Sequence, residues 1–114
     1  MASVDNYLQG WNTGDSTRMD KALHPALVKR IVKKAEDGNH IVSEHTKESM
    51  VSKTSPKTKK PYNPNYYTAK ILDIYNNIAS VRSETKGFID YIHLVKIDDE
   101  WEIINVLWDK TIKK

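Results

Sequence analysis

The sequence predicts an α+β domain in which a curved, mainly antiparallel β-sheet is covered by helices on one face. Two stretches, 66–86 and 88–108, have the composition of strands and contain a turn signal near the middle of each. A third stretch, 3–24, has the periodicity of an amphipathic helix. The chain has 114 residues, which suits one domain, so residues 1–114 are assigned to a single unit.

The N-terminal stretch predicts a helix, a tight turn and a second helix. Its apolar side chains recur at i, i+3, i+4 and i+7, which places on one helix face Val4, Tyr7, Leu8 and Trp11. Gly14 can supply the left-handed residue that ends this helix, and Asp15 can cap the next one. His24-Pro25 should end the second helix, because the residue before a proline disfavours the helical conformation. Residues 3–24 therefore form a lid with one apolar surface.

A short hairpin and a third helix are expected next. Residues 27–34 are rich in β-branched side chains and alternate in character, and residues 40–45 return as a second strand after a glycine-containing turn. Residues 46–53 are interpreted as a short helix whose N-terminus is capped by Ser43 or Thr46.

The second half of the chain predicts four long antiparallel strands. The stretch 55–65 carries three prolines and is expected to be a loop. Residues 66–75 and 78–86 form a hairpin, with Asn76-Asn77 at its tip because asparagine tolerates positive φ. Phe88–Trp108 forms the last hairpin around an acidic turn.

Both faces of the last strand are apolar. Simple alternation places Trp101, Ile103 and Leu107 on one face, and on the other Ile104, Val106 and Trp108. A face exposed to water would alternate apolar with polar residues, and the helices can cover one face only. The other face should meet a loop or a second copy of the chain, and we favour a homodimer formed through the sheet.

Four motifs together resemble the putative lumazine-binding branch of the nuclear transport factor 2-like superfamily. They are YLQGWNTGD from Tyr7, MDKALHP from Met19, FIDYIHLVK from Phe88 and WEIINVLW from Trp101. The resemblance implies a cystatin-like cone, in which a strongly curved sheet wraps around the N-terminal helices and leaves a pocket at the open end. The superfamily includes ketosteroid isomerases, polyketide cyclases and non-catalytic binding domains, so the resemblance implies the fold and leaves the function open.

Asp90 and His93 are the candidate catalytic residues, because a long apolar strand holds ionisable groups only for a reason. They lie three apart, so a regular strand directs them to opposite faces. If the acidic turn has three residues, His93 pairs with Asn105. If it has two, Ile92 pairs with Asn105, and Asp90 shares that face.

Each candidate has a functional and a structural interpretation. In the first, Asp90 or His93 is a general base or acid inside an apolar cone, where burial raises a carboxyl pKa. In the second, His93 bonds a neighbouring strand or lies at a dimer interface, and Asp90 pairs with a lid residue.

Five further residues are candidates for ligand binding. Trp11 and Tyr91 could stack on a flat heterocycle or pack in the core. His24 could face the cone mouth or satisfy a helix C-terminus. Arg30 could bind an anionic ligand or form a salt bridge, and Asn105 would add a polar group to the pocket.

Several classes of site are not expected. The chain has no cysteine, which excludes disulfides and thiolate chemistry. No histidine pair has the helical spacing of metal ligands, and we expect neither a metal nor a cofactor. The net charge is +3, and the basic residues gather in the proline-rich connection, which favours a solvated loop over nucleic-acid binding.

The absence of a long apolar run or an export signal favours a cytoplasmic location without membrane contact, unless the natural start is longer. The leading hypothesis is therefore a homodimeric domain that binds a small flat or apolar molecule in its cone. The alternative is an enzyme of isomerase, dehydratase or cyclase type that uses Asp90 or His93 as general base.

Overall fold

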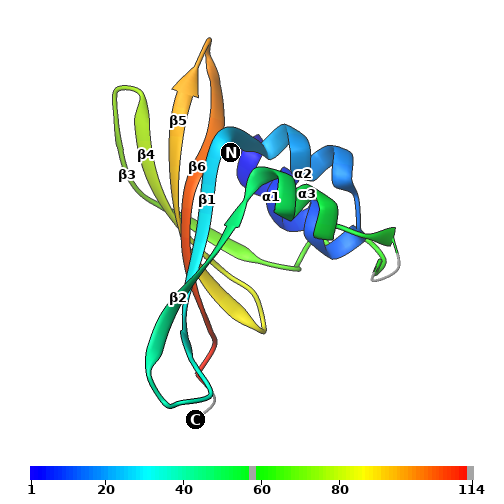
Figure 1. Cartoon of the computed structure of the whole chain (residues 1–114). Helices are drawn as coiled ribbons and strands as arrows, with labels where there is room; N and C mark the ends of the chain where they lie inside the picture. Colours follow the sequence, from blue (N-terminus) through cyan, green and yellow to red (C-terminus); the bar gives the residue numbers. More distant parts are fainter. Residues whose placement is uncertain (57–58, 113–114) are drawn as a thin grey trace.

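The computed structural model describes residues 1–56 and 59–112, and its elements are drawn in Figure 1. The helices are α1 (Ala2–Thr13), α2 (Ser16–Ala22) and α3 (Lys47–Lys53). The strands are β1 (Leu23–Lys34), β2 (His40–Thr46), β3 (Thr68–Tyr75), β4 (Ile78–Glu84), β5 (Phe88–Ile97) and β6 (Glu100–Lys110). None of these helices is long and apolar enough to cross a membrane. The predicted loop 55–65 includes residues 57–58, which lie outside the described part.

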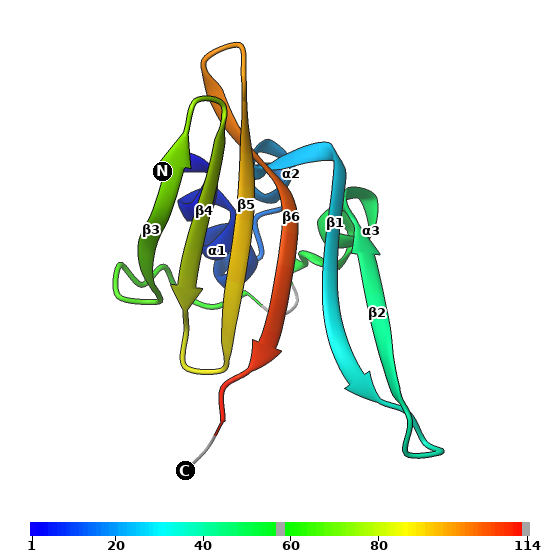
Figure 2. The same cartoon turned by 90° about the vertical axis from the view of Figure 1, so that its left-hand side faces the viewer.

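Within the described residues, six strands form one sheet in the order β2-β1-β6-β5-β4-β3. β1 runs parallel to β6, and the other neighbouring strands are antiparallel. The three helices lie on one face, here called the inner face (Figure 1), whereas no helix lies in front of the outer face (Figure 2). The predicted α+β class, a curved and mainly antiparallel sheet around N-terminal helices, is confirmed.

The lid forms largely as predicted, with one boundary corrected. Gly14 ends α1 in the left-handed conformation, at φ 70°, and the Asp15 side chain accepts hydrogen bonds from two backbone amides of α2. The second helix ends at Ala22, two residues before the predicted end. Leu23 already pairs with β6, and the pre-proline residue His24 is extended, as its steric restriction favours.

The turn between β5 and β6 has two residues, but the strand register is the one expected from three. Ile97 pairs with Glu100, and both turn residues, Asp98 and Asp99, have positive φ. His93 nevertheless pairs with Asn105, because the register shifts by one residue after His93. A β-bulge therefore supplies the residue that the turn lacks.

The bulge also corrects the predicted faces of the last strand. Leu94 pairs with Ile103, so Ile104 is the extra residue, and it lines a hollow on the outer face. Ile103 and Val106 are both fully buried on the inner face, whereas Leu107 is exposed on the outer face. Simple alternation had placed Ile103 with Leu107, and Ile104 with Val106.

The core lies between α1, α2, α3 and the inner face. Its most deeply buried members include Tyr7, Leu8, Met19, Leu23, Ile92 and Ile103. The lid helices contribute the first three and the sheet the others, so the predicted apolar surface of the lid packs directly on the sheet.

Gly14→Ala is expected to lower the melting temperature more than Gly38→Ala does. Both glycines have positive φ, at 70° and 88°, so an alanine at either adds a backbone cost of roughly 1–2 kcal/mol. A Cβ at Gly14 would also lie 2.4 Å from the Ser55 carbonyl oxygen, whereas one at Gly38 meets no atom within 4 Å. Thermal and urea denaturation measure the two losses, and equal losses would contradict the close approach of Gly14 to Ser55.

Candidate functional site

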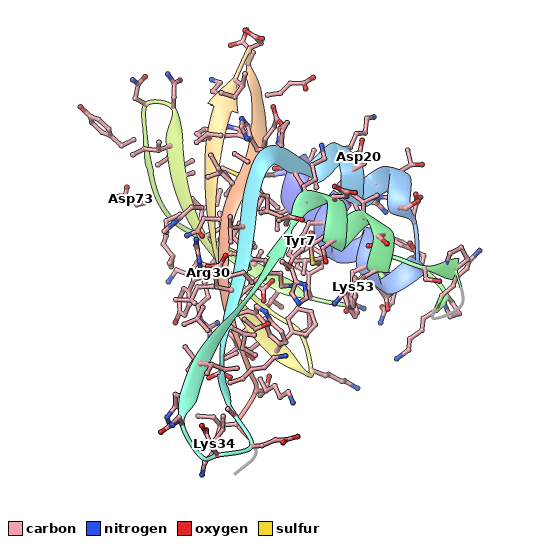
Figure 3. The ribbon with its side chains drawn as sticks, in the orientation of Figure 1. Tyr7, Asp20, Arg30, Lys34, Lys53 and Asp73 are labelled. Atoms are coloured by element: carbon pink, nitrogen blue, oxygen red, sulfur yellow. The ribbon has the colours of Figure 1, made fainter. Side chains whose placement is uncertain are left out.

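A small cavity of about 180 Å³ lies between α1, α3 and the inner face of the sheet. Its walls carry four aromatic rings and three basic side chains, which are Tyr7, Trp11, Phe88, Trp108, Lys29, His45 and Lys53. Figure 3 shows Tyr7 and Lys53 on the helix side of the sheet and Arg30 on the opposite side. The cavity is therefore apolar in its walls and cationic in its polar groups.

Three polar side chains form a hydrogen-bonded chain beside this cavity. The Tyr7 hydroxyl donates to Asp90 Oδ2 over 2.7 Å, and Lys29 Nζ donates to the Tyr7 hydroxyl oxygen over 2.5 Å. Tyr7 is 2% exposed and Asp90 is fully buried. The chain joins α1, β1 and β5, and it confirms the structural interpretation in which Asp90 pairs with a lid residue.

The Lys29 amine lies among three aromatic rings. Its nitrogen is 5.0 Å from the centre of the Tyr7 ring, 5.1 Å from that of Trp108 and 5.9 Å from that of Phe88. The Phe88 and Trp108 rings pack edge to face, with centres 6.0 Å apart and planes at 76°. The rings form a partial cage whose faces attract a cation.

Burial controls the ionisation of this cluster. Burial raises the pKa of Asp90 above its ordinary value of 3.8, opposed by the charge of Lys29 and the Tyr7 hydrogen bond. Burial lowers the pKa of Lys29 from 10.5, opposed by the charge of Asp90. Burial, followed by the charge and hydrogen bond of Asp90, raises the pKa of Tyr7 well above 10.0, so this hydroxyl keeps its proton at neutral pH.

Two buried polar atoms near the cavity have no hydrogen-bond partner within the described residues. They are Asp90 Oδ1, an acceptor when ionised, and Trp108 Nε1, a donor. Asp90 and Trp108 are direct partners in the β5–β6 ladder, so the two atoms belong to the same part of the inner face. Native proteins leave few such atoms unpaired, and their concentration here marks a polar region with unused binding capacity.

His45 adds a titratable group on the β2 side of the cavity. Its Nδ1 lies 3.2 Å from Ser49 Oγ. Burial lowers the His45 pKa, and the charges of Lys53, Lys29 and Lys33 lower it further, so the neutral imidazole is favoured.

Only two of the predicted site residues belong to this region. Trp11 lines the cavity and is 39% exposed, and Asp90 lies behind Tyr7. His24 lies at the start of β1, where its Nδ1 accepts from the Ala26 amide over 2.9 Å, and it does not line the cavity.

The remaining predicted residues gather on the outer face. Arg30 donates to Asn105 Oδ1 over 3.2 Å and to Glu44 Oε1 over 3.1 Å, and Asn105 Nδ2 lies 3.1 Å from His93 Nδ1. Tyr91, 48% exposed, belongs to the same face. Asp90 and His93 thus face opposite sides, as their spacing predicts, and the predicted salt bridge of Arg30 and inter-strand hydrogen bond of His93 are confirmed.

Lys29 was not among the predicted site residues. The alternation of 27–34 placed Lys29 on the same side as Ile31, but it did not show that this side is the inner one. A lysine that shares a strand face with buried Leu27 and Ile31 is the signal that could have identified it. Within residues 1–56 and 59–112, no group of three or more histidines and carboxylates is placed to hold a metal ion.

Comparison with known proteins places these features in a family context. Residues 1–109 match the family described as putative lumazine-binding. No curated protein matches the chain.

Solved structures share the fold. A nuclear transport factor 2-like protein of unknown function from Silicibacter pomeroyi is 12% identical, with a TM-score of 0.73 over 96% of this chain and 91% of that one. One from Shewanella baltica is 17% identical, with a TM-score of 0.68 over 97% and 90%. A putative Ca/calmodulin-dependent kinase II association domain from Exiguobacterium sibiricum is 8% identical, with a TM-score of 0.61 over 97% and 89%.

Asp90→Asn is expected to change the pH dependence of stability in a defined direction. The raised pKa of Asp90 means that the folded state binds this proton more tightly than the unfolded state does. Relative to the variant, the unfolding free energy of the wild type should therefore fall as pH rises from about 3.8 through the higher pKa of the folded state. Urea denaturation between about pH 3.5 and 6 measures the difference, and a difference that rises with pH would contradict the burial of Asp90.

Proposed function

The chain belongs to the putative lumazine-binding family, and we propose that it binds a small flat ring compound in the cavity between α1, α3 and the sheet. The observation that carries this proposal is the Lys29 amine held among the rings of Tyr7, Phe88 and Trp108. Aromatic walls stack on a flat ring, and a lysine amine has three donors, of which Tyr7 accepts one. Ring and amine together select a heterocycle with acceptor atoms.

The size and charge of the cavity narrow the ligand class. Pockets for drug-sized molecules have volumes of roughly 300–1,000 Å³, whereas this one has about 180 Å³, which limits the ligand to one or two fused rings. Lys29, Lys53 and His45 supply donors, while the Asp90 carboxylate is hidden behind Tyr7. Ring carbonyls or an acidic ring N–H, as in a lumazine, fit this lining better than a cationic ring does.

Lumazine is expected to quench tryptophan fluorescence saturably, because Trp11 and Trp108 line the cavity. Lys29→Met should weaken binding on the order of tenfold to a hundredfold, since a hydrogen bond to a charged group contributes about 1.5–3 kcal/mol. The matched control is Lys34→Met, at the exposed tip of the β1–β2 hairpin (Figure 3), which should bind as the wild type does.

The same titration with pterin and flavin tests the size limit, because the three-ring flavin should bind less well than the two-ring compounds. An unchanged dissociation constant for Lys29→Met, or no saturable quenching by any of the three, would remove the support for this site.

We also propose that the chain forms a homodimer through the outer face. Paired residues of a sheet project to the same side, so the strand register identifies the outer apolar side chains. Six of them are at least 48% exposed, namely Val32, Val42, Tyr75, Ile78, Tyr91 and Leu107. They come from all six strands, and a hollow of about 350 Å³ lies among β3, β4, β5 and β6. Exposed apolar side chains on every strand of one sheet face, with polar side chains among them, are typical of an interface.

The wild type should therefore sediment at twice the 13.2 kDa chain mass. Leu107→Glu, near the middle of the outer face, should weaken the dimer by more than about a hundredfold, because a buried unpaired carboxylate costs several kcal/mol. Ile112→Glu is the control, since Ile112 is 82% exposed beyond the end of β6. Sedimentation equilibrium distinguishes these outcomes, and a monomeric wild type would end the dimer proposal.

An enzyme of isomerase, dehydratase or cyclase type is the second candidate function. One observation favours it: Tyr7 lines the cavity, and its hydroxyl donates a hydrogen bond to the buried Asp90 carboxylate. Proton transfer in the cavity would run through Tyr7, with Asp90 as the proton store. His93 lies on the outer face, so its use as a general base would need a separate site there.

A further inference from the structure

Lys29 differs from the other lysines of the described chain in how its amine is held. Lys29 lines the cavity, and its amine donates to a neutral hydroxyl, that of Tyr7. No carboxylate of the described residues lies within ion-pair distance of it, whereas Lys47 pairs with Asp20 at the surface. Asp90 approaches it only through Tyr7.

We propose that Lys29 reacts covalently with a small aromatic aldehyde or ketone in the cavity and forms a reversible imine. This activity goes beyond the non-covalent binding proposed above, although both use the same cavity. Three observations support it: Lys29 lines the cavity, its amine lies beside rings that also line the cavity, and a hydroxyl that can exchange protons lies 2.5 Å from the amine.

The chemistry balances with the groups present. The neutral Lys29 nitrogen attacks the carbonyl carbon, and a C–N bond forms as the C=O π bond breaks. The former carbonyl oxygen takes a proton from the Tyr7 hydroxyl. The new ammonium then returns a proton to the Tyr7 oxygen, which gives a neutral carbinolamine. The carbinolamine then loses its hydroxyl as water: the nitrogen gives up its remaining proton, the leaving oxygen gains one, and the C=N bond forms. No oxidant, reductant or metal is needed.

Reaction needs the neutral amine, so every charged or titratable group around Lys29 matters. Asp90 on β5 and the three rings favour the ammonium, whereas burial opposes it, and the net shift of the Lys29 pKa is downward. Tyr7 on α1 stays protonated. Lys53 on α3 and His45 on β2 line the same cavity, and after burial the charges of Lys53 and Lys29 lower the His45 pKa.

The test uses the wild-type chain with benzaldehyde and sodium cyanoborohydride, which reduces an imine to a stable secondary amine. Peptide mapping gives the rate of modification at each lysine. Lys29 is expected to react several-fold faster than exposed Lys34 at pH 7, because the cavity holds the aromatic aldehyde beside its amine and burial favours the neutral form of that amine. A Lys29 rate equal to or below that of Lys34 overturns the proposal.

Two variants test the roles of the neighbours. Asp90→Asn removes the charge that raises the Lys29 pKa, so the midpoint of the pH profile for Lys29 labelling should move to lower pH. Tyr7→Phe keeps the ring but removes the proton-exchanging hydroxyl, so labelling above the midpoint should be several-fold slower. A purely structural role would reduce the yield in both variants without moving the midpoint, and that result overturns the assigned roles.

The covalent and non-covalent proposals can fail separately. If lumazine binds and Lys29 is not labelled faster than Lys34, the imine proposal fails and the binding site stands. If Lys29 is labelled selectively and lumazine does not bind, the ring-binding proposal fails and the reactive lysine stands. If both hold, saturating lumazine should slow Lys29 labelling severalfold while leaving Lys34 unchanged.

Discussion

The position of the lid depends on one buried carboxylate. Asp90 has no solvent to stabilise its charge, and an unpaired buried charge is costly, so the Tyr7 hydroxyl must remain within hydrogen-bond reach. Tyr7 belongs to the same helix face as Val4 and Leu8, which are buried in the core. This hydrogen bond and the core contacts fix both the rotation and the axial position of α1, and that orientation carries Trp11, one turn further on, to the cavity wall.

A single extra residue in β6 determines which side chains of this strand lie on the inner face and which lie on the outer face. The bulge at Ile104 lets Ile103 and Val106 both point inward, so β6 gives the core apolar side chains on both sides of the bulge. It also places Asn105 beside His93 on the outer face. With a regular two-residue turn, Asn105 would share the inner face with Asp90, and the core would contain an amide that needs partners.

Hydrogen bonds on the outer face join Arg30 to Asn105 and Asn105 to His93. Which atom donates in each of them follows from the chemistry of Arg30. A guanidinium only donates, so Arg30 fixes the Asn105 oxygen on its own side and turns the amide nitrogen toward His93. His93 Nδ1 is then the acceptor of the hydrogen bond from the Asn105 amide. Glu44 anchors the other end by pairing with Arg30. The network forms one polar row across β2, β1, β6 and β5 on the outer face.

Local patterns predicted the elements well, and tertiary pairing explains the rest. Helical periodicity located α1, and Asn76, with φ 51°, lies at the tip of its hairpin as its tolerance of positive φ predicts. Nothing in the residues around Ile104 marks a bulge, because the extra residue is identical to Ile103 before it. Tyr7 and Asp90 are 83 residues apart, so no local pattern joins them. Lys29 was missed because lysines are exposed by default, and only the packing of β1 shows otherwise.

The order of Lys29, Tyr7 and Asp90 around the cavity also determines which ligands the cavity can bind. The carboxylate is the innermost member of the chain, and the hydroxyl and the amine lie between it and the cavity. An incoming molecule therefore meets donors first. The raised pKa of Tyr7 keeps its hydroxyl protonated over the physiological range, and this single proton is donated to Asp90. The donors that remain for a ligand in this chain are therefore the N–H groups of Lys29. Such a site matches molecules whose reactive or recognisable atom is an electron-rich oxygen or nitrogen. A cationic ligand would find the basic side chains at the wall before it could reach the one buried negative charge.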